Sequence, residues 1–260
     1  VGKGKKQLVL SDLTAEDVYR YACEDADITL KLYNYFKDKL DKLKDQMILY
    51  NNVELPLVKI LSRMELVGVK VDKSKLSQLS ESFGKKISEL ENNIYQIVGH
   101  SFNISSPKQL QEIFYEEMNL PVLKKTPKGQ PSTSEDVMID LADSHEVPKL
   151  VLEYRNLSKL KNTYTDKLGE IINQETKRLH TSYNQTVTIT GRLSSSNPNL
   201  QNIPIKTKNG RDIRKTFIPE RGSTIISADY SQIELRVMAH LSQDQTLLES
   251  FKNNEDIHSV

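Results

Sequence analysis

The sequence contains no tryptophan and only one cysteine, Cys23, among its 260 residues. A lone cysteine cannot form an internal disulfide, and so little cysteine is typical of a protein from a reducing cytosol. Cys23 falls among apolar positions of a predicted helix, where we expect an inert, buried thiol. These features exclude the class of small secreted domains that disulfides stabilise.

Long apolar runs are missing as well. Spanning a bilayer takes roughly 20 predominantly apolar residues, and the start of the chain also lacks the apolar core of a secretory signal. We therefore expect a cytoplasmic protein with no membrane partner. The first residue is Val1 and not Met, so we expect an internal piece of a longer protein.

Charge is nearly balanced over the chain, with a formal net charge of +1, which does not by itself point to nucleic acid. Residues 206–221, however, hold six Lys and Arg residues against two acids. Such a cluster can meet phosphates. On charge alone, a solvated loop is the interpretation that we favour.

Apolar residues recur every three or four positions through the first two thirds of the chain, which predicts helices. Thr14, with Asp17 three residues later, is typical of a capped helix start. The predicted helices span residues 14–43, 46–67, 73–98, 105–118, 134–142 and 148–172. In the first of them, the row expected to face inward is Val18, Ala22, Asp25, Thr29, Leu32 and Phe36.

From His180 onward the pattern changes to β-branched runs, which predict strands at 187–190 and 224–228. An amphipathic helix is expected to begin near Ser231, with Ile233, Val237, Met238 and Leu241 facing inward. Between the helices predicted at 105–118 and 134–142, residues 124–134 are predicted to form an exposed, basic, hydroxyl-rich loop.

Asp229 is predicted to stand where a buried strand ends, two residues before the last helix begins. A carboxylate held there can bind a hard cation such as Mg²⁺, although two-metal phosphoryl transfer needs a second acid. By pattern alone we favour a structural role instead, in which Asp229 at the helix start interacts favourably with the helix dipole. Ser231 and Glu234 fit a capping box, which would give Glu234 a purely structural role.

The stretch DYSQIELR, Asp229 to Arg236, resembles motif A of the family A DNA polymerases residue for residue. Further motifs of that family occur in the expected order, and the resemblance covers nearly the whole chain. They are the segments 131–135, 159–166, 190–204 and 256–258, together with 21–27, which resembles the last motif of the exonuclease domain of bacterial members.

The resemblance implies a mostly α front part followed by a partial α+β palm with an antiparallel sheet. Residues 1–43 would be the C-terminal end of a 3′–5′ exonuclease domain, 44–175 a helical DNA-binding thumb, and 176–260 the first part of the palm. The implied reaction is template-directed addition of dNTPs to a primer, with primer–template DNA as partner. We expect a monomer at the nucleoid.

The resemblance also implies roles for palm residues. Asp229, assisted by the Tyr230 carbonyl, would bind the two catalytic Mg²⁺ ions. Glu234 would exclude a ribose 2′-hydroxyl, and His258 would lie beside the triphosphate, with Ser231, Gln232 and Ile233 completing the nucleotide site. Arg192 would reach the minor groove at the primer end, and the duplex would be lined by Asn199, Gln201 and Asn202.

Physical chemistry supports the minor-groove assignment independently. Purine N3 and pyrimidine O2 are acceptors that every base pair presents there, so Arg, Asn and Gln donors can sense geometry without reading sequence. Residues 192–202 are dense in such donors. The same composition is typical of an ordinary turn cluster, and by itself it does not decide between the two.

The resemblance further implies contacts from the thumb to the DNA backbone. For each candidate taken alone we favour an ordinary surface residue, so the group carries the prediction. Its members are Ser105, Ser106, Lys108, Lys125, Ser132, Thr133, Lys159, Asn162, Thr163 and Tyr164.

Tyr21 and Asp25 are four residues apart and therefore share a helix face. In the resembled exonuclease site this Asp binds metal and this Tyr orients water, but three further carboxylates are absent, so we expect only a vestigial site. The family's fingers helix and second catalytic carboxylate would lie beyond Val260. We therefore expect the chain alone not to polymerise, and a non-catalytic DNA-binding module or a proofreading unit are the alternatives.

Overall fold

The structure is a computed structural model that describes residue 8 and residues 12–253. The chain divides into two compact units, residues 1–217 and 218–260. His258 and its motif lie outside the described residues. Within the described part, no helix is both long enough and apolar enough to cross a membrane.

The first unit begins with α1 (Ala15–Leu40), whose N-terminus is the predicted capping box. The amide of Asp17 donates to Thr14 Oγ1 at 3.3 Å, and the Thr14 amide donates back to the Asp17 carboxylate at 3.1 Å. The predicted inward row is wrong, because no residue of α1 is buried and Phe36 is 52% exposed. Cys23 is exposed too. An apolar face is buried only where another element covers it, and the described residues leave this row uncovered.

A helical path then runs through α2 (Lys44–Leu49), the π-helical turn η3 (Tyr50–Glu54) and α3 (Leu55–Val67), as predicted for 46–67. Gly68 ends it with φ 64° and ψ −173°. The chain continues through the short strand β1 (Val69–Lys70) into α4 (Lys73–Val98), which has the predicted bounds and an Asp72 cap.

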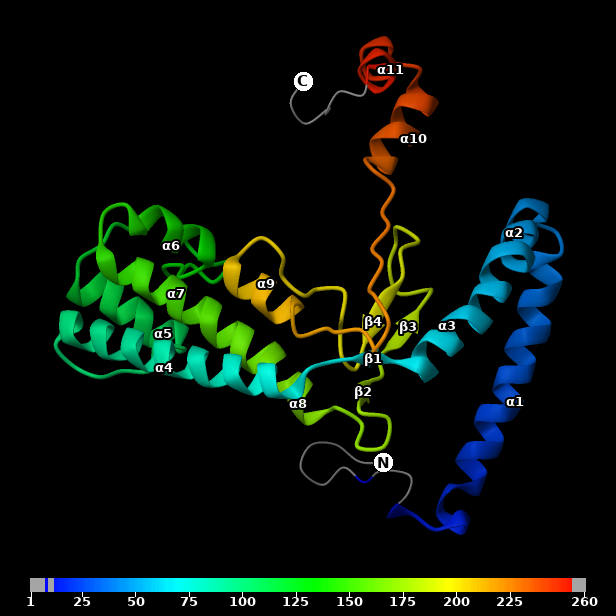
Figure 1. Ribbon diagram of the computed structural model, residues 1–260, viewed down its shortest axis with the longest axis horizontal. Helices are drawn as coiled ribbons and strands as arrows, with labels where there is room; N and C mark the ends of the chain where they lie inside the picture. The colour runs from blue at the N-terminus through cyan, green and yellow to red at the C-terminus, as the bar shows by residue number, and fades with distance from the viewer. Residues whose placement is uncertain (1–7, 9–11, 254–260) are drawn as a thin grey trace. The chain divides into compact units, whose positions relative to one another are not determined.

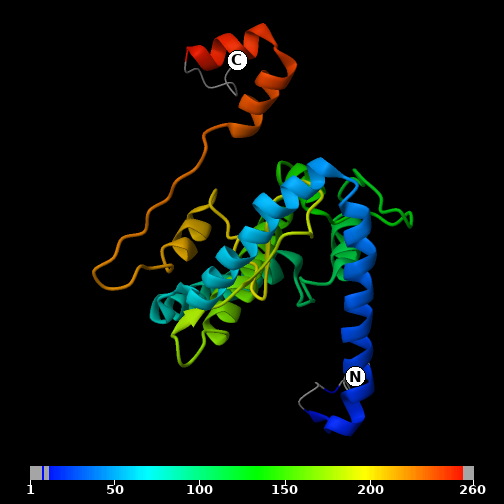
Figure 2. The same ribbon diagram turned by 90° about the vertical axis from the view of Figure 1, so that its right-hand side faces the viewer.

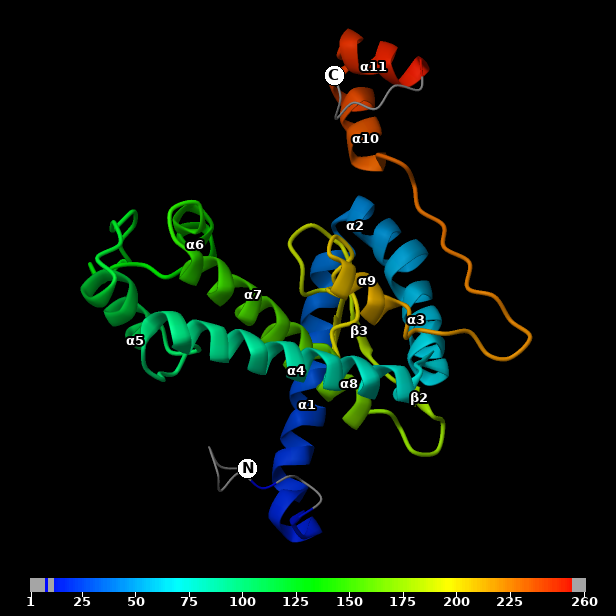
Figure 3. The same ribbon diagram turned by 60° about the vertical axis from the view of Figure 1, so that its left-hand side comes forward.

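Helix α4 is one side of a helical bundle, visible in Figures 1 and 3 as two long antiparallel helices side by side. It packs against α7 (Glu146–Leu160), the π-helical turn η5 (Lys161–Asp166) and α8 (Lys167–Glu170). The far end of the bundle is closed by three shorter elements: α5 (Pro107–Gln111), the π-helical turn η4 (Glu112–Glu117) and α6 (Glu135–Ala142).

Two apolar clusters hold the bundle together. One lies at the end near the strands and includes Leu76, Phe83 and Leu168. The other lies at the far end around Phe114 and Met138, both fully buried. Because each cluster joins α4 to α7, these two helices form a rigid support for the surface that α7 and η5 present.

The strands are short and antiparallel. β1 pairs with β2 (Arg178–Leu179), and β3 (Ser182–Asn184) pairs with β4 (Ser194–Ser196) so that Tyr183 lies opposite Ser195. The strand predicted at 187–190 is wrong: those residues lie in the connection from β3 to β4. The helix α9 (Lys208–Arg214) follows. A mostly helical front followed by small antiparallel sheets confirms the predicted fold class.

The second unit contains α10 (Ile233–Ser242) and α11 (Gln245–Lys252), which lie close to each other in Figure 2. The strand predicted at 224–228 is wrong, because residues 218–230 pair with no strand in the described part of the chain. Backbone N–H and C=O groups form a strand only with a partner. The predicted inward row of α10 is likewise exposed, with Met238 at 57% and Leu241 at 75%.

Candidate nucleic-acid interface

A cavity of about 1100 Å³ lies within the first unit, between the helical bundle and the loop that follows β4. One wall comes from α7, η5 and α8, and the other from residues 197–209. The cavity brings together five of the residues that the sequence predicted to contact DNA. They are Lys159, Thr163 and Tyr164 on the helical wall and Asn199 and Asn202 on the loop wall.

The helical wall is one face of a nearly continuous helix. Its lining residues follow helical spacing, namely Lys149, Glu153, Asn156, Leu160, Thr163 and Lys167. Lys149, Asn156 and Lys167 also belong to this face, although they were not predicted from the sequence. Extending the three- and four-residue spacing from Thr163 in both directions would have found them.

The loop wall is fixed by its own hydrogen bonds. The buried Thr181 hydroxyl donates to the carbonyls of Ser196 at 3.0 Å and Pro198 at 2.7 Å. The Asn199 side-chain oxygen accepts from the Gln201 amide at 3.0 Å, and the Gln201 side chain donates to Leu193 O at 3.1 Å. The expected turn cluster therefore exists, and it holds Asn199 at the cavity wall.

The two walls are joined directly by Tyr164, whose side chain is 6% exposed. Its hydroxyl donates to the carbonyl oxygen of Asn202. Burial raises the pKa of the Tyr164 phenol, so the group remains a neutral donor at physiological pH. Tyr164 therefore holds one wall against the other, and its hydroxyl is engaged within the protein.

The cavity carries charges of both signs. Its lining includes three cations, Lys149, Lys159 and Lys167, and two carboxylates, Glu135 and Glu153, which sum to +1. All five are exposed. Cations on a helix face can neutralise phosphates, whereas the carboxylates of Glu135 on α6 and Glu153 on α7 repel them.

The other thumb candidates lie toward the far end of the bundle. Ser105 and Lys108 are exposed, while Ser106 caps α5 through a 3.4 Å hydrogen bond from the Gln109 amide. Lys108 lies 4.0 Å from Glu112, at the limit of an ion pair. The predicted contact of these residues with the DNA backbone stays a prediction.

The loop at 124–134 is exposed only in part. Lys125 is exposed, but Ser132 and Thr133 are each only 7% exposed, so the prediction of an exposed loop is wrong for both. The Thr133 carbonyl accepts a hydrogen bond from Arg155 at 2.7 Å, and the Ser132 hydroxyl lies 2.8 Å from that of Ser134. The Ser132 hydroxyl and the Thr133 carbonyl anchor the base of the loop, which sequence composition could not distinguish from its tip.

Several cations of the 206–221 cluster are held within α9 and its surroundings. Arg211 donates to the Lys206 carbonyl at 2.6 Å, Arg214 to the Ile203 carbonyl at 3.3 Å, and Lys215 lies 2.9 Å from Asp212. Arg192 is exposed on the β3–β4 side of the same unit. Arg211, Arg214 and Lys215 therefore stabilise this segment through contacts within the protein.

Motif A lies in the second unit. Asp229 and Tyr230 are exposed, with Tyr230 at 81%, and the prediction that Asp229 ends a buried strand is wrong. Gln232, in the left-handed region at φ 53°, precedes α10 without a side-chain cap, so the predicted capping box of Ser231 and Glu234 is wrong too. Arg192 belongs to the other unit, and its contact with the minor groove at the primer end stays a prediction.

Tyr21 and Asp25 do interact on α1. The side-chain hydrogen bond to the Asp25 carboxylate raises the pKa of the Tyr21 phenol. Among the described residues, no three His, Cys, Asp or Glu side chains gather to hold a metal ion. Tyr21 and Asp25 therefore share a helix face, as predicted. Within the described part of the chain, Asp25 has no cluster of further metal-binding side chains around it.

The sequence profile of DNA polymerase family A matches residues 73–260, well over half of the chain. The chain therefore belongs to DNA polymerase family A. This confirms the family that motif A and its companion motifs predicted.

Individual relatives agree with this membership. The chain is 49% identical over 258 residues to DNA polymerase I of Pseudomonas aeruginosa, and 45% identical over 260 residues to DNA polymerase I of Bacillus subtilis. Each alignment covers 99% of this chain but only 28% and 29% of the relatives, so the chain spans about a quarter of their length.

A solved structure supports the same fold. The polymerase domain of Pol1 from M. smegmatis, in complex with DNA primer–template and dNTP, superposes with a TM-score of 0.81 at 39% identity. The match covers 88% of this chain and 40% of that one.

Proposed function

We propose that this chain supplies the thumb and the first part of the palm of a DNA-directed DNA polymerase, with boundaries near residues 44 and 176. Its cavity wall binds the backbone of primer–template duplex, and residues 1–43 are the end of an exonuclease domain. The observation that carries this proposal is the cavity at which Lys159 and Thr163 face Asn199 and Asn202.

The two walls suit different parts of a duplex. Lys159 and the Thr163 hydroxyl offer an ammonium and a neutral donor, which suit phosphate oxygens. Asn199 and Asn202 offer amide donors, which suit the acceptors shared by all base pairs in the minor groove. Such a site binds any sequence, as a replicating enzyme requires, and would act in a monomeric protein at the nucleoid.

The polymerase chemistry falls to motif A in this proposal. Asp229 and the Tyr230 carbonyl offer the hard oxygen ligands that Mg²⁺ prefers, and Mg²⁺ in such a site stabilises the charge that develops at the transferred phosphate. Two ions need a second carboxylate, and the described residues gather no such cluster around Asp229. The oxygen atoms of Asp229 and Tyr230 therefore suit Mg²⁺, but the described residues do not supply enough ligands for two ions. We derive no catalytic step from this site.

A binding titration tests the proposal. We expect the chain to bind fluorescent primer–template duplex more tightly than single strand, with an affinity that falls steeply as salt rises. Lys159→Ala should weaken binding and reduce the slope of log K against log[salt] by roughly 1. The matched control is Lys37→Ala, an exposed cation on α1 outside the cavity, which should leave the slope unchanged. Equal losses from both variants would overturn the assignment of the cavity.

A further inference from the structure

We propose that Ser80, Lys161 and Asp166 are positioning residues that hold the π-helical turn η5 in register, and that Lys161 does not bind DNA. The inference rests on the proposed function, because it concerns how the DNA-facing wall is held. It separates two lysines, Lys159 and Lys161, that lie in the same short basic motif and look equivalent in the sequence.

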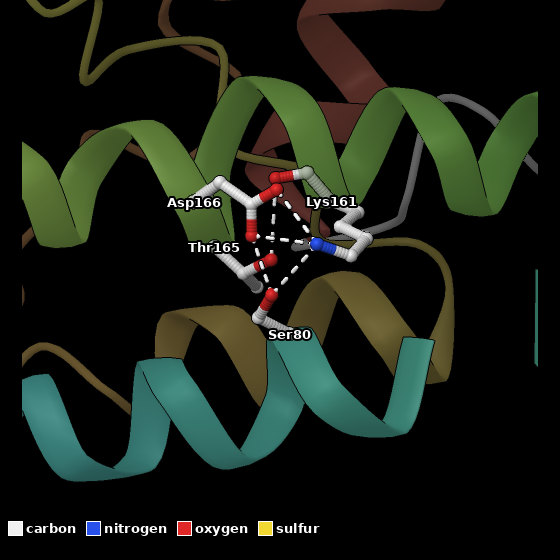
Figure 4. A network of polar contacts seen from close by, with 4 residues as sticks. All are labelled: Ser80, Lys161, Thr165 and Asp166. Carbon is white, nitrogen blue, oxygen red and sulfur yellow. Dashed lines mark hydrogen bonds and ion pairs between the residues drawn. The ribbon is translucent and has the colours of Figure 1, made fainter. Parts of the chain in front are cut away.

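The three side chains form a closed network between α4 and η5, drawn in Figure 4. Lys161 Nζ lies 2.7 Å and 3.0 Å from the two carboxylate oxygens of Asp166, and 3.0 Å from Ser80 Oγ. The Ser80 hydroxyl donates to the same carboxylate. Each member therefore contacts the other two, and Ser80 is the member that belongs to the opposite helix.

The sequence separation of Lys161 and Asp166 makes their contact specific to the π-helical turn. Five residues advance an α-helix by about 500°, so two side chains at this spacing diverge by about 140° around the axis. A π-helical turn, with i→i+5 bonding, is wider and brings positions five apart closer to one face. The ion pair thus forms in the observed register and opposes relaxation to an ordinary α-helix.

Lys161 is engaged on the inner side of the wall. Its side chain is 27% exposed, and its stem passes over α4 at Gly84, where an added Cβ would lie 3.5 Å from Lys161 Cε. Because the ammonium already has a carboxylate and a hydroxyl as acceptors, a phosphate would have to displace them. Lys159, in contrast, is exposed and lines the cavity.

The register matters because the same turn carries two residues of the cavity wall, of which the exposed Thr163 is the proposed DNA contact. Thr163 and Tyr164 lie between Lys161 and Asp166 and line the cavity, and the Tyr164 hydroxyl reaches the Asn202 carbonyl. Removing one residue from the turn would rotate the neighbouring helix by about 100°. The network therefore keeps the Tyr164 link to the loop wall in place.

Two readouts on the 260-residue chain separate positioning from phosphate binding. The first, made without DNA, is amide hydrogen exchange across residues 163–167. The second is duplex affinity over a salt series. For Lys161→Met and for Ser80→Ala we expect exchange at least tenfold faster in this segment and weaker duplex binding with an unchanged salt slope. Lys159→Ala should do the opposite, lowering the slope by roughly 1 and leaving the exchange unchanged.

Each outcome is decisive. A reduced salt slope with unchanged exchange in Lys161→Met would make Lys161 a phosphate ligand and overturn the proposal. If Lys161→Met fails to fold, Ser80→Ala, which leaves the ion pair present, decides through the same exchange measurement. If the unaltered chain binds no duplex, the proposed function fails, while the exchange result still confirms or refutes the positioning network.

Discussion

Replacing Gly68 by Ala should loosen the junction at which α3 passes into the strand that leads to the bundle. Gly68 has φ 64° and ψ −173°, a backbone region that only glycine adopts without strain. A Cβ added there would lie 2.5 Å from the Leu179 carbonyl oxygen and 2.8 Å from the His180 ring. The ring cannot easily withdraw, because its Nδ1 lies 2.7 Å from the Glu65 carbonyl oxygen.

Two costs therefore add in the Gly68→Ala variant. The backbone strain is on the order of 1–3 kcal/mol, and forcing an extra carbon into a packed site typically costs about 1–3 kcal/mol. Together they predict that the free energy of unfolding falls by about 2–6 kcal/mol. Small domains have total stabilities of roughly 5–15 kcal/mol, so the variant should lose a large share of its stability.

Gly84→Ala is the matched control for the same chemical change. Gly84 lies inside α4, and its added Cβ would make only an ordinary 3.5 Å contact with Lys161. Ala is favoured over Gly in a helix interior, so we expect a gain of roughly 0.5–1 kcal/mol. Urea unfolding followed by far-UV circular dichroism measures both variants. A Gly68→Ala variant within about 0.5 kcal/mol of the parent, judged against the packing cost above, would refute the reasoning.

Three further predictions follow from other parts of the chain. Phe114 is fully buried in the far cluster, so Phe114→Ala should lower the free energy of unfolding by about 3–5 kcal/mol in the same assay. Partial burial raises the pKa of the Asp166 carboxyl, but hydrogen bonds from Lys161 and Ser80 outweigh it and leave the pKa below its ordinary value. That carboxylate therefore adds stability above its unfolded pKa of about 3.9 that is lost as pH falls through the lower folded pKa. The parent should lose more stability than Asp166→Asn between about pH 5 and pH 2, and equal acid losses would contradict this. In a polymerase that carries this segment, Glu234→Ala should raise ribonucleotide incorporation in primer extension, and unchanged sugar selectivity would count against its role.

The helical elements could be predicted from the sequence because their signals are local. The bounds of α4 match the prediction because Asp72 caps its start, Gly99 follows its end, and apolar residues repeat at helical spacing between them. The two strand predictions were wrong because strand formation depends on non-local pairing. β-branched runs at 187–190 and 224–228 favour strands, but pairing depends on a distant partner that local sequence does not specify.

The candidate site shows the same division between local and distant information. Motif resemblance selected Lys159, Thr163 and Tyr164 and separately selected Asn199 and Asn202. It could not show that the Tyr164 hydroxyl reaches Asn202, 38 positions away, or that Ser80 reaches Asp166, 86 positions away. Those contacts depend on how α7 and η5 pack on α4, and only the fold supplies that.

Site-directed cross-linking tests most directly whether the cavity holds duplex DNA. The exposed Cys23 is replaced in Cys23→Ser, and a single photoreactive thiol label is then introduced by Thr163→Cys or Asn199→Cys, on opposite walls, or by Lys37→Cys as control. The proposed function predicts cross-links to primer–template duplex from both walls and none from the control. Bound duplex that cross-links from neither wall, or equally from the control, would contradict it.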